Sequence, residues 1–126
     1  MAVGSAILRT FVAAAAGPLM ACEPCDTSIV PSIVVEVVDS LTGEAAASGA
    51  LALATDGRYT DTLEVYALDA AGRPLSVASR GERVGNYSVR VTRTGYAAWE
   101  RGNVRIRQDG CHTNQVQLTA RLQPAP

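Results

Sequence analysis

The stretch Gly85-Asn-Tyr-Ser-Val-Arg-Val-Thr-Arg-Thr-Gly95-Tyr96 decides the fold class, because its apolar and polar side chains alternate. Tyr87, Val89 and Val91 fall on one side of an extended chain, and the residues between them are polar. Successive side chains of a strand point to opposite faces, so the pattern predicts a β-strand with one buried and one solvated face. The glycines at the two ends permit the reversals that such a strand needs.

Shorter stretches with a related pattern occur on both sides of this strand. Their β-branched and apolar residues predict further strands at 33–38, 48–55, 62–68, 99–107 and 116–122. Turn sequences that contain Asp and Gly are found at 39–43, 56–57, 69–75 and 109–110. About seven short strands, turns roughly every eight to twelve residues and no convincing helix indicate an all-β fold, an antiparallel Greek-key β-sandwich.

The composition indicates one domain. A chain of 126 residues suffices for a single core, and 48% hydrophobic against 18% charged residues argues against disorder. All 11 basic residues are arginines. Residues 23–69 hold nine acids and one arginine, whereas residues 70–126 hold nine arginines and three acids. We expect the two halves to neutralise each other on folding rather than to form a polyanion-binding face, and we predict no nucleic-acid partner.

Residues 1–21 have the features of a signal peptide, with one basic residue, Arg9, and an apolar run that begins at Phe11. The run ends in Leu19-Met20-Ala21-Cys22, which resembles the bacterial lipobox. The resemblance implies that the thiol of Cys22 carries diacylglycerol and that the chain is cut before this residue. Met20 is unusual at its place in the motif, so cleavage by an ordinary signal peptidase stays open.

These features predict a lipoprotein signal peptide at 1–21, an acylated Cys22 with its tether at 22–32, a β-sandwich at 33–122 and a flexible C-terminus at 123–126. Two or three acyl chains hold a protein to a membrane, whereas a single chain binds weakly. Glu23 follows the cysteine. By resemblance to enterobacterial lipoproteins, this residue allows transport onward, so we expect an exported protein that is lipid-anchored to the cell envelope at the outer membrane.

The three cysteines are an odd number, which in an exported protein leaves one thiol over. Acylation of Cys22 removes that thiol and leaves Cys25 and Cys111 to pair in an oxidising compartment. A disulfide that closes so long a loop contributes about 4 to 5 kcal/mol in the chain-entropy model. The alternative is a zinc site formed by these three cysteines and His112. Neighbouring residues of a strand point to opposite faces, so we favour the disulfide and expect His112 to be an exposed strand or turn residue.

Two segments resemble the carboxypeptidase regulatory-like domain: Val35-Glu-Val-Val-Asp39 with Thr42-Gly43-Glu-Ala, and the stretch from Gly85 to Tyr96. That domain is a transthyretin-like β-sandwich, and the resemblance covers residues 33–122. It implies a fold more than a function, since no peptidase is attached in this sequence. The tail cysteine and the later Cys111-His112 are similar to those of small exported lipoproteins in this family, which supports the disulfide.

The sequence carries no arrangement typical of catalysis. It has one histidine, no HxxE zinc motif, no nucleophile elbow and no phosphate loop, so we expect no enzymatic activity and no cofactor. We expect instead a structural or protein-interaction module that recruits an envelope protein at the membrane.

The alternative is a binding module for an acidic glycan or for the phosphates of lipopolysaccharide. Its candidate residues are Arg90, Arg93, Tyr96, Trp99, Arg101, Arg105 and Arg107. For the arginines we favour a solvated face that is paired with acids, and for Trp99 a place in the core.

Overall fold

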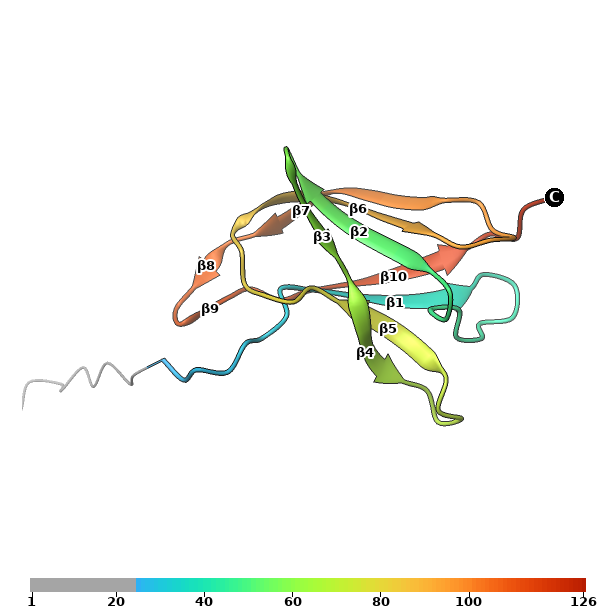
Figure 1. The fold of residues 1–126 in the computed structure, drawn as a ribbon, viewed down its shortest axis with the longest axis horizontal. Helices are drawn as coiled ribbons and strands as arrows, with labels where there is room; N and C mark the ends of the chain where they lie inside the picture. The colour runs from blue at the N-terminus through green and yellow to red at the C-terminus, as the bar shows by residue number, and fades with distance from the viewer. Residues whose placement is uncertain (1–24) are drawn as a thin grey trace, which may run out of the picture.

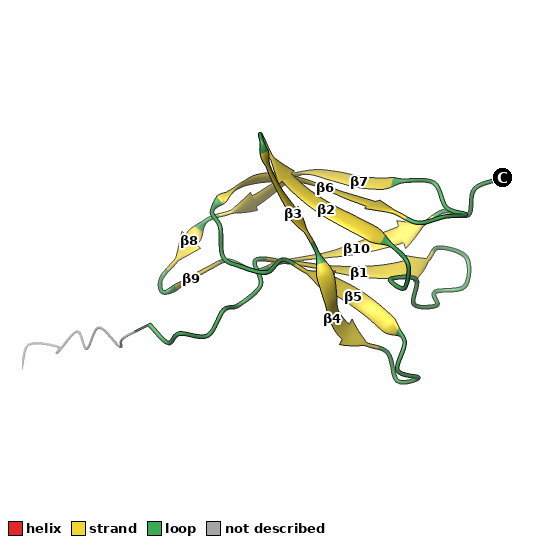
Figure 2. Ribbon diagram, viewed as in Figure 1, coloured by secondary structure: helices red, strands yellow, loops and turns green. Residues whose placement is uncertain are grey.

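The computed structural model describes residues 25–126. The predicted signal peptide, Cys22 and Glu23 lie outside the described residues. Residues 25–126 contain strands and no helix (Figure 2), so no helix among them is long and apolar enough to cross a membrane. The strands are β1 (Ile33–Asp39), β2 (Leu51–Asp56), β3 (Tyr59–Thr62), β4 (Glu64–Leu68), β5 (Pro74–Ala78), β6 (Gly85–Thr92), β7 (Trp99–Ile106), β8 (Gln108–Asp109), β9 (His112–Thr113) and β10 (Val116–Leu122).

Eight of these strands form two four-stranded layers, which Figure 1 shows one above the other. One sheet has the order β10-β1-β5-β4 and the other the order β3-β2-β6-β7. Val35 and Val37 of β1 and Val89 and Val91 of β6 are fully buried in the core that the two sheets share. Tyr87 is 3% exposed, so the alternation predicted for 85–92 and the all-β fold are both confirmed.

One pairing differs from the purely antiparallel expectation. β1 and β10 run parallel, in register from Ile33 opposite Val116 to Asp39 opposite Leu122. The other pairings of the two large sheets are antiparallel. The expectation was wrong for this pair because alternation of side chains reports which face is buried and carries no information on strand direction.

The strand predicted at 62–68 is divided in the structure. β3 belongs to one sheet and β4 to the other (Figure 1). Leu63 is the one residue between the end of β3 and the start of β4. The side chain of Leu63 is 5% exposed in the core, and its backbone N–H donates to the carbonyl of Ala52 at 2.9 Å. One extended run of sequence therefore supplies an edge strand to each layer.

Three smaller features were not anticipated. β5 occupies 74–78, where the sequence predicted only the end of a turn, and β8 and β9 form a hairpin around the predicted break at 109–110. Gly110 has φ 64°, which a glycine adopts without strain at the tip of this hairpin. The C-terminal residues expected to be flexible are tied by backbone hydrogen bonds, Ala97 N–H to Gln123 and Ala125 N–H to Gly95.

Candidate functional site

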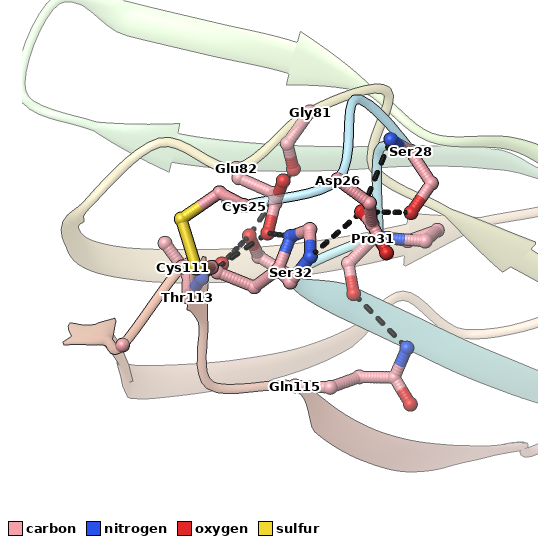
Figure 3. A network of polar contacts seen from close by, with 12 residues as sticks. Cys25, Asp26, Ser28, Pro31, Ser32, Gly81, Glu82, Cys111, Thr113 and Gln115 are labelled. Carbon is pink, nitrogen blue, oxygen red and sulfur yellow. Dashed lines mark hydrogen bonds and ion pairs between the residues drawn. A yellow bond between two sulfur atoms is a disulfide. The ribbon is translucent and has the colours of Figure 1, made fainter. Parts of the chain in front are cut away.

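Three segments far apart in the sequence meet at the end of the domain where β1 begins. They are the tail at 25–32, the loop at 79–84 that follows β5, and the β8–β9 hairpin (Figure 3). We call this meeting point the tail junction. Cys25 and Cys111 join the tail to the hairpin by a disulfide, with their Cα atoms 5.1 Å apart. The predicted pairing is therefore present.

His112 is held between two carboxylates of the tail junction. Its Nδ1 lies 2.7 Å from Oε1 of Glu82, and its Nε2 lies 3.2 Å from Oδ1 of Asp26. The hydrogen bond with Glu82 is the main reason that the pKa of His112 is raised above its ordinary value. His112 lies in β9, so the expectation of a strand residue is confirmed, but its side chain is only 26% exposed, so the expectation that it is exposed was wrong. The tail and the loop cover it from two sides.

The two carboxylates are stabilised in their charged forms. The hydrogen bond with His112 lowers the pKa of Glu82, which also accepts the backbone N–H of Thr113 at 3.1 Å. The hydrogen bond from the Ser28 hydroxyl lowers the pKa of Asp26. The raised pKa of the histidine and the lowered pKa values of its partners agree, and they favour an imidazolium between two carboxylates.

A chain of buried hydroxyls lies beside this charged group. The Ser79 hydroxyl accepts the backbone N–H groups of Ser32 and Ile33 at 3.0 and 3.1 Å. The hydroxyls of Ser32 and Thr113 are 2.6 Å apart, and Ser32 also donates to the carbonyl of Gly81. Ser32, Ser79 and Thr113 are each less than 9% exposed. These bonds fix the first residues of the domain to the loop and to the hairpin at once.

The disulfide and the two carboxylates bound to His112 limit the chemistry that the tail junction permits. Both sulfurs are in the disulfide, so neither Cys25 nor Cys111 offers a thiolate to zinc. Asp26 and Glu82 bind opposite nitrogens of one imidazole ring, which keeps the two carboxylates from facing a common ion. Over residues 25–126, no group of three metal-ligating side chains is brought together. Cys22, the remaining candidate ligand, lies outside the described residues.

Three arginines of the predicted glycan-binding set lie in strands of the β3-β2-β6-β7 sheet, on two different faces. Arg90 is on the outer face and is paired with Glu100, their side-chain atoms 2.6 Å apart. Arg105 stands opposite Asn86 in the register and is also on the outer face. Arg101 stands opposite the buried Val89 and is therefore turned the other way. A register shift between the two strands separates these positions, so the structure does not align them in one strip.

The other members of the set are mostly engaged within the domain. Trp99 packs against the core as predicted, with Arg101 5.7 Å from its ring centroid. Tyr96 donates its hydroxyl to Asp39 at 2.7 Å, and Arg93 donates to the carbonyl of Ala46. The side chain of Arg107 is exposed. Binding of an acidic glycan through these residues stays a prediction.

The expected neutralisation between the two halves of the chain is visible in ion pairs. Three of them join residues 23–69 to residues 70–126: Arg73 with Asp69, Arg80 with Glu64, and Arg83 with Asp56. His112 adds a fourth such link through Asp26. Part of the opposite charge of the two halves is thus neutralised by ion pairs within the domain.

Glu82 and the three buried hydroxyls were not among the site residues predicted from the sequence. Glu82 lies in a loop between two arginines, Arg80 and Arg83, and nothing in its spacing indicates a partner 30 residues later. The sequence contained one signal, the adjacency of Cys111 and His112. A disulfide between Cys111 and the tail also brings an acid of the tail close to the histidine.

No protein-family model matches this chain, and no curated protein matches it.

Proposed function

We propose that this chain is a non-enzymatic lipoprotein of the cell envelope, anchored through Cys22 at the outer membrane. In this proposal its two layers form a Greek-key β-sandwich of the carboxypeptidase regulatory-like, transthyretin-like type. The domain serves as a structural or protein-interaction module. Two four-stranded sheets around one core support the sandwich, and the disulfide supports export, because such bonds persist in oxidising compartments.

The observation that carries the proposal is the locked tail junction. Cys25 follows the proposed acylation site by three residues, and three extended residues span at most about 10 Å. From Cys25 onward the tail is fixed by the disulfide, by Asp26 with His112, and by the Gln115 amide, which donates to the carbonyl of Pro31 at 3.0 Å. An anchor on Cys22 would therefore hold this end of the domain close to the membrane surface.

The contacts of the tail junction also favour a structural role over catalysis. A general base or a nucleophile needs one face open to substrate. Both nitrogens of His112 are directed at carboxylates, and the hydroxyls of Ser32 and Thr113 are bonded to each other. These groups are already bonded to partners within the domain, and those bonds hold the three segments together.

An edge strand supports the interaction role. All five residues of β4 are exposed, and Val65 and Leu68 keep 56% and 57% of their surface accessible. β4 ends its sheet, so one side of its backbone is unpaired within residues 25–126. An extended segment of an envelope protein can add to such an edge.

The test is the intact mass of the membrane-extracted protein, measured with alkylation before and after reduction. We expect a chain that begins at Cys22, carries acyl mass and gains two alkyl groups only after reduction. An unlipidated chain with three free thiols would overturn the anchored, disulfide-locked module.

A further inference from the structure

A groove crosses the outer face of the β10-β1-β5-β4 sheet. It has a volume of about 420 Å³ and draws its lining from all four strands. The face is the outer one, because the residues of β1 that enter the core are Ile33, Val35 and Val37, and the groove is lined by Val34 and Glu36 between them. The groove belongs neither to the tail junction nor to the arginine set.

Three oxygen-bearing side chains form a row across the groove. Glu36 of β1 stands opposite Thr119 of β10 on one side and opposite Ser76 of β5 on the other. Neighbouring strands are about 4.8 Å apart, so the row spans about 10 Å, close to the length of one or two sugar rings.

The row is not satisfied by the protein itself. Within residues 25–126, the side chains of Thr119, Glu36 and Ser76 make no hydrogen bond and no ion pair. By contrast, the exposed Glu100 on the outer face of the other sheet is bound by Arg90. Glu36 is the one charged side chain in the groove lining. Its carboxylate is therefore available to a ligand with hydrogen-bond donors.

An apolar surface lies beside the row. Tyr66 of β4 is 55% exposed and lines the groove next to Ala67, which stands opposite Ser76. Val34 forms part of the floor and is 9% exposed. The groove thus places an aromatic ring and an aliphatic floor next to hydroxyl and carboxylate oxygens.

We propose that this groove binds a neutral saccharide. A sugar ring presents hydroxyls at its edge and C–H groups on its faces. The Glu36 carboxylate accepts hydrogen bonds from adjacent sugar hydroxyls, the exposed Thr119 adds a further bond, and Tyr66 covers an apolar face of the ring, while Ser76, only 6% exposed, lies in the floor of the groove. The saccharide is neutral because an acidic sugar would bring a second negative charge to Glu36. This site is independent of the membrane anchor, so either proposal can fail without the other.

Binding is measured by calorimetry on the full-length protein, extracted in a detergent without a sugar headgroup. The neutral probes are maltotriose, cellotriose and the β-1,4-linked trisaccharide of N-acetylglucosamine. Trigalacturonate reports on acidic sugars, and butylammonium reports on an amine attracted to the carboxylate and the ring. We expect at least one neutral probe to bind with a Kd on the order of 1 mM, and neither trigalacturonate nor butylammonium to compete with it.

Variants locate the binding in the groove. Glu36→Ala and Tyr66→Ala should each raise the Kd about tenfold, the loss expected when a charged hydrogen bond or a stacking contact is removed. Tyr66→Phe keeps the ring and should stay within about threefold. Glu100→Ala removes an exposed carboxylate from the other sheet and should leave the Kd unchanged. Unchanged circular dichroism confirms that the exposed substitutions leave the fold intact.

Three results would overturn the saccharide site. One is the absence of heat with all three neutral probes at concentrations up to about 20 mM. A second is binding that Glu36→Ala and Tyr66→Ala leave unchanged. The third is binding of butylammonium alone, which would assign the groove to amines.

Discussion

Loss of the Cys25–Cys111 disulfide should destabilise the domain strongly without changing its folded structure. The two cysteines are 86 residues apart in the sequence, so the bond closes a loop that contains nearly the whole domain. In the chain-entropy model, the freedom regained by the unfolded chain costs about 4.6 kcal/mol at 25 °C. Small domains have unfolding free energies of roughly 5 to 15 kcal/mol, so this loss is a large part of the total.

The assay is urea unfolding of Cys25→Ala/Cys111→Ala in a Cys22→Ser background, which avoids acylation and thiol exchange. With an m value of about 1.5 kcal/mol/M, the midpoint should fall by about 3 M urea. Dithiothreitol should lower the midpoint of the Cys22→Ser parent by the same amount and leave the double variant unchanged. If the double variant is unfolded in buffer, both it and the parent are measured in sucrose, which favours the compact state of each protein.

A loss below about 1 kcal/mol at an equal m value would refute this reasoning. It would mean that the unfolded chain is already restricted near Cys25 and Cys111, or that the other contacts of the tail junction hold the tail in the unfolded ensemble.

Three further predictions concern single positions. The raised pKa of His112 stabilises the fold below the ordinary value of 6.5, and this contribution is lost as the pH rises through the folded pKa; melting temperatures at pH 6 and pH 9 should therefore differ more for the wild type than for His112→Gln. Ser79→Ala removes the acceptor of two buried N–H groups and should cost about 1 to 3 kcal/mol in urea unfolding, whereas the exposed Ser28→Ala should cost little. Leu63→Ala should cost about 2 to 5 kcal/mol because it empties a buried site at the crossing between the sheets, and the exposed Thr62→Ala is its control; equal losses for the two variants would contradict the placement of Leu63 in the core.

The charge pattern shows which features of the ion pairs composition can predict and which it cannot. The count of acids and arginines in the two halves predicted mutual neutralisation, and pairs such as Arg83 with Asp56 at 3.0 Å are of that kind. Composition did not indicate which arginines remain without an acid. Pairing depends on which strands are neighbours, and that order is a property of the folded sheets.

Local alternation determined most of the strands of this protein. Tyr87, Val89 and Val91 are buried as predicted, because the direction of a side chain in an extended chain depends only on its position along that chain. The pairing of Cys25 with Cys111 could also be predicted, because the proposed acylation of Cys22 would leave one pair among the three cysteines.

Only the tertiary structure decided the parallel pairing of β1 with β10, the crossing at Leu63, the bond between His112 and Glu82, and the row of Thr119, Glu36 and Ser76. Each of these depends on the register or the contact of segments many residues apart. Side-chain alternation is the same for either strand direction and for every register shift of two residues. The choice among them is made by packing the two sheets on one core, and the sequence of one strand does not contain that information.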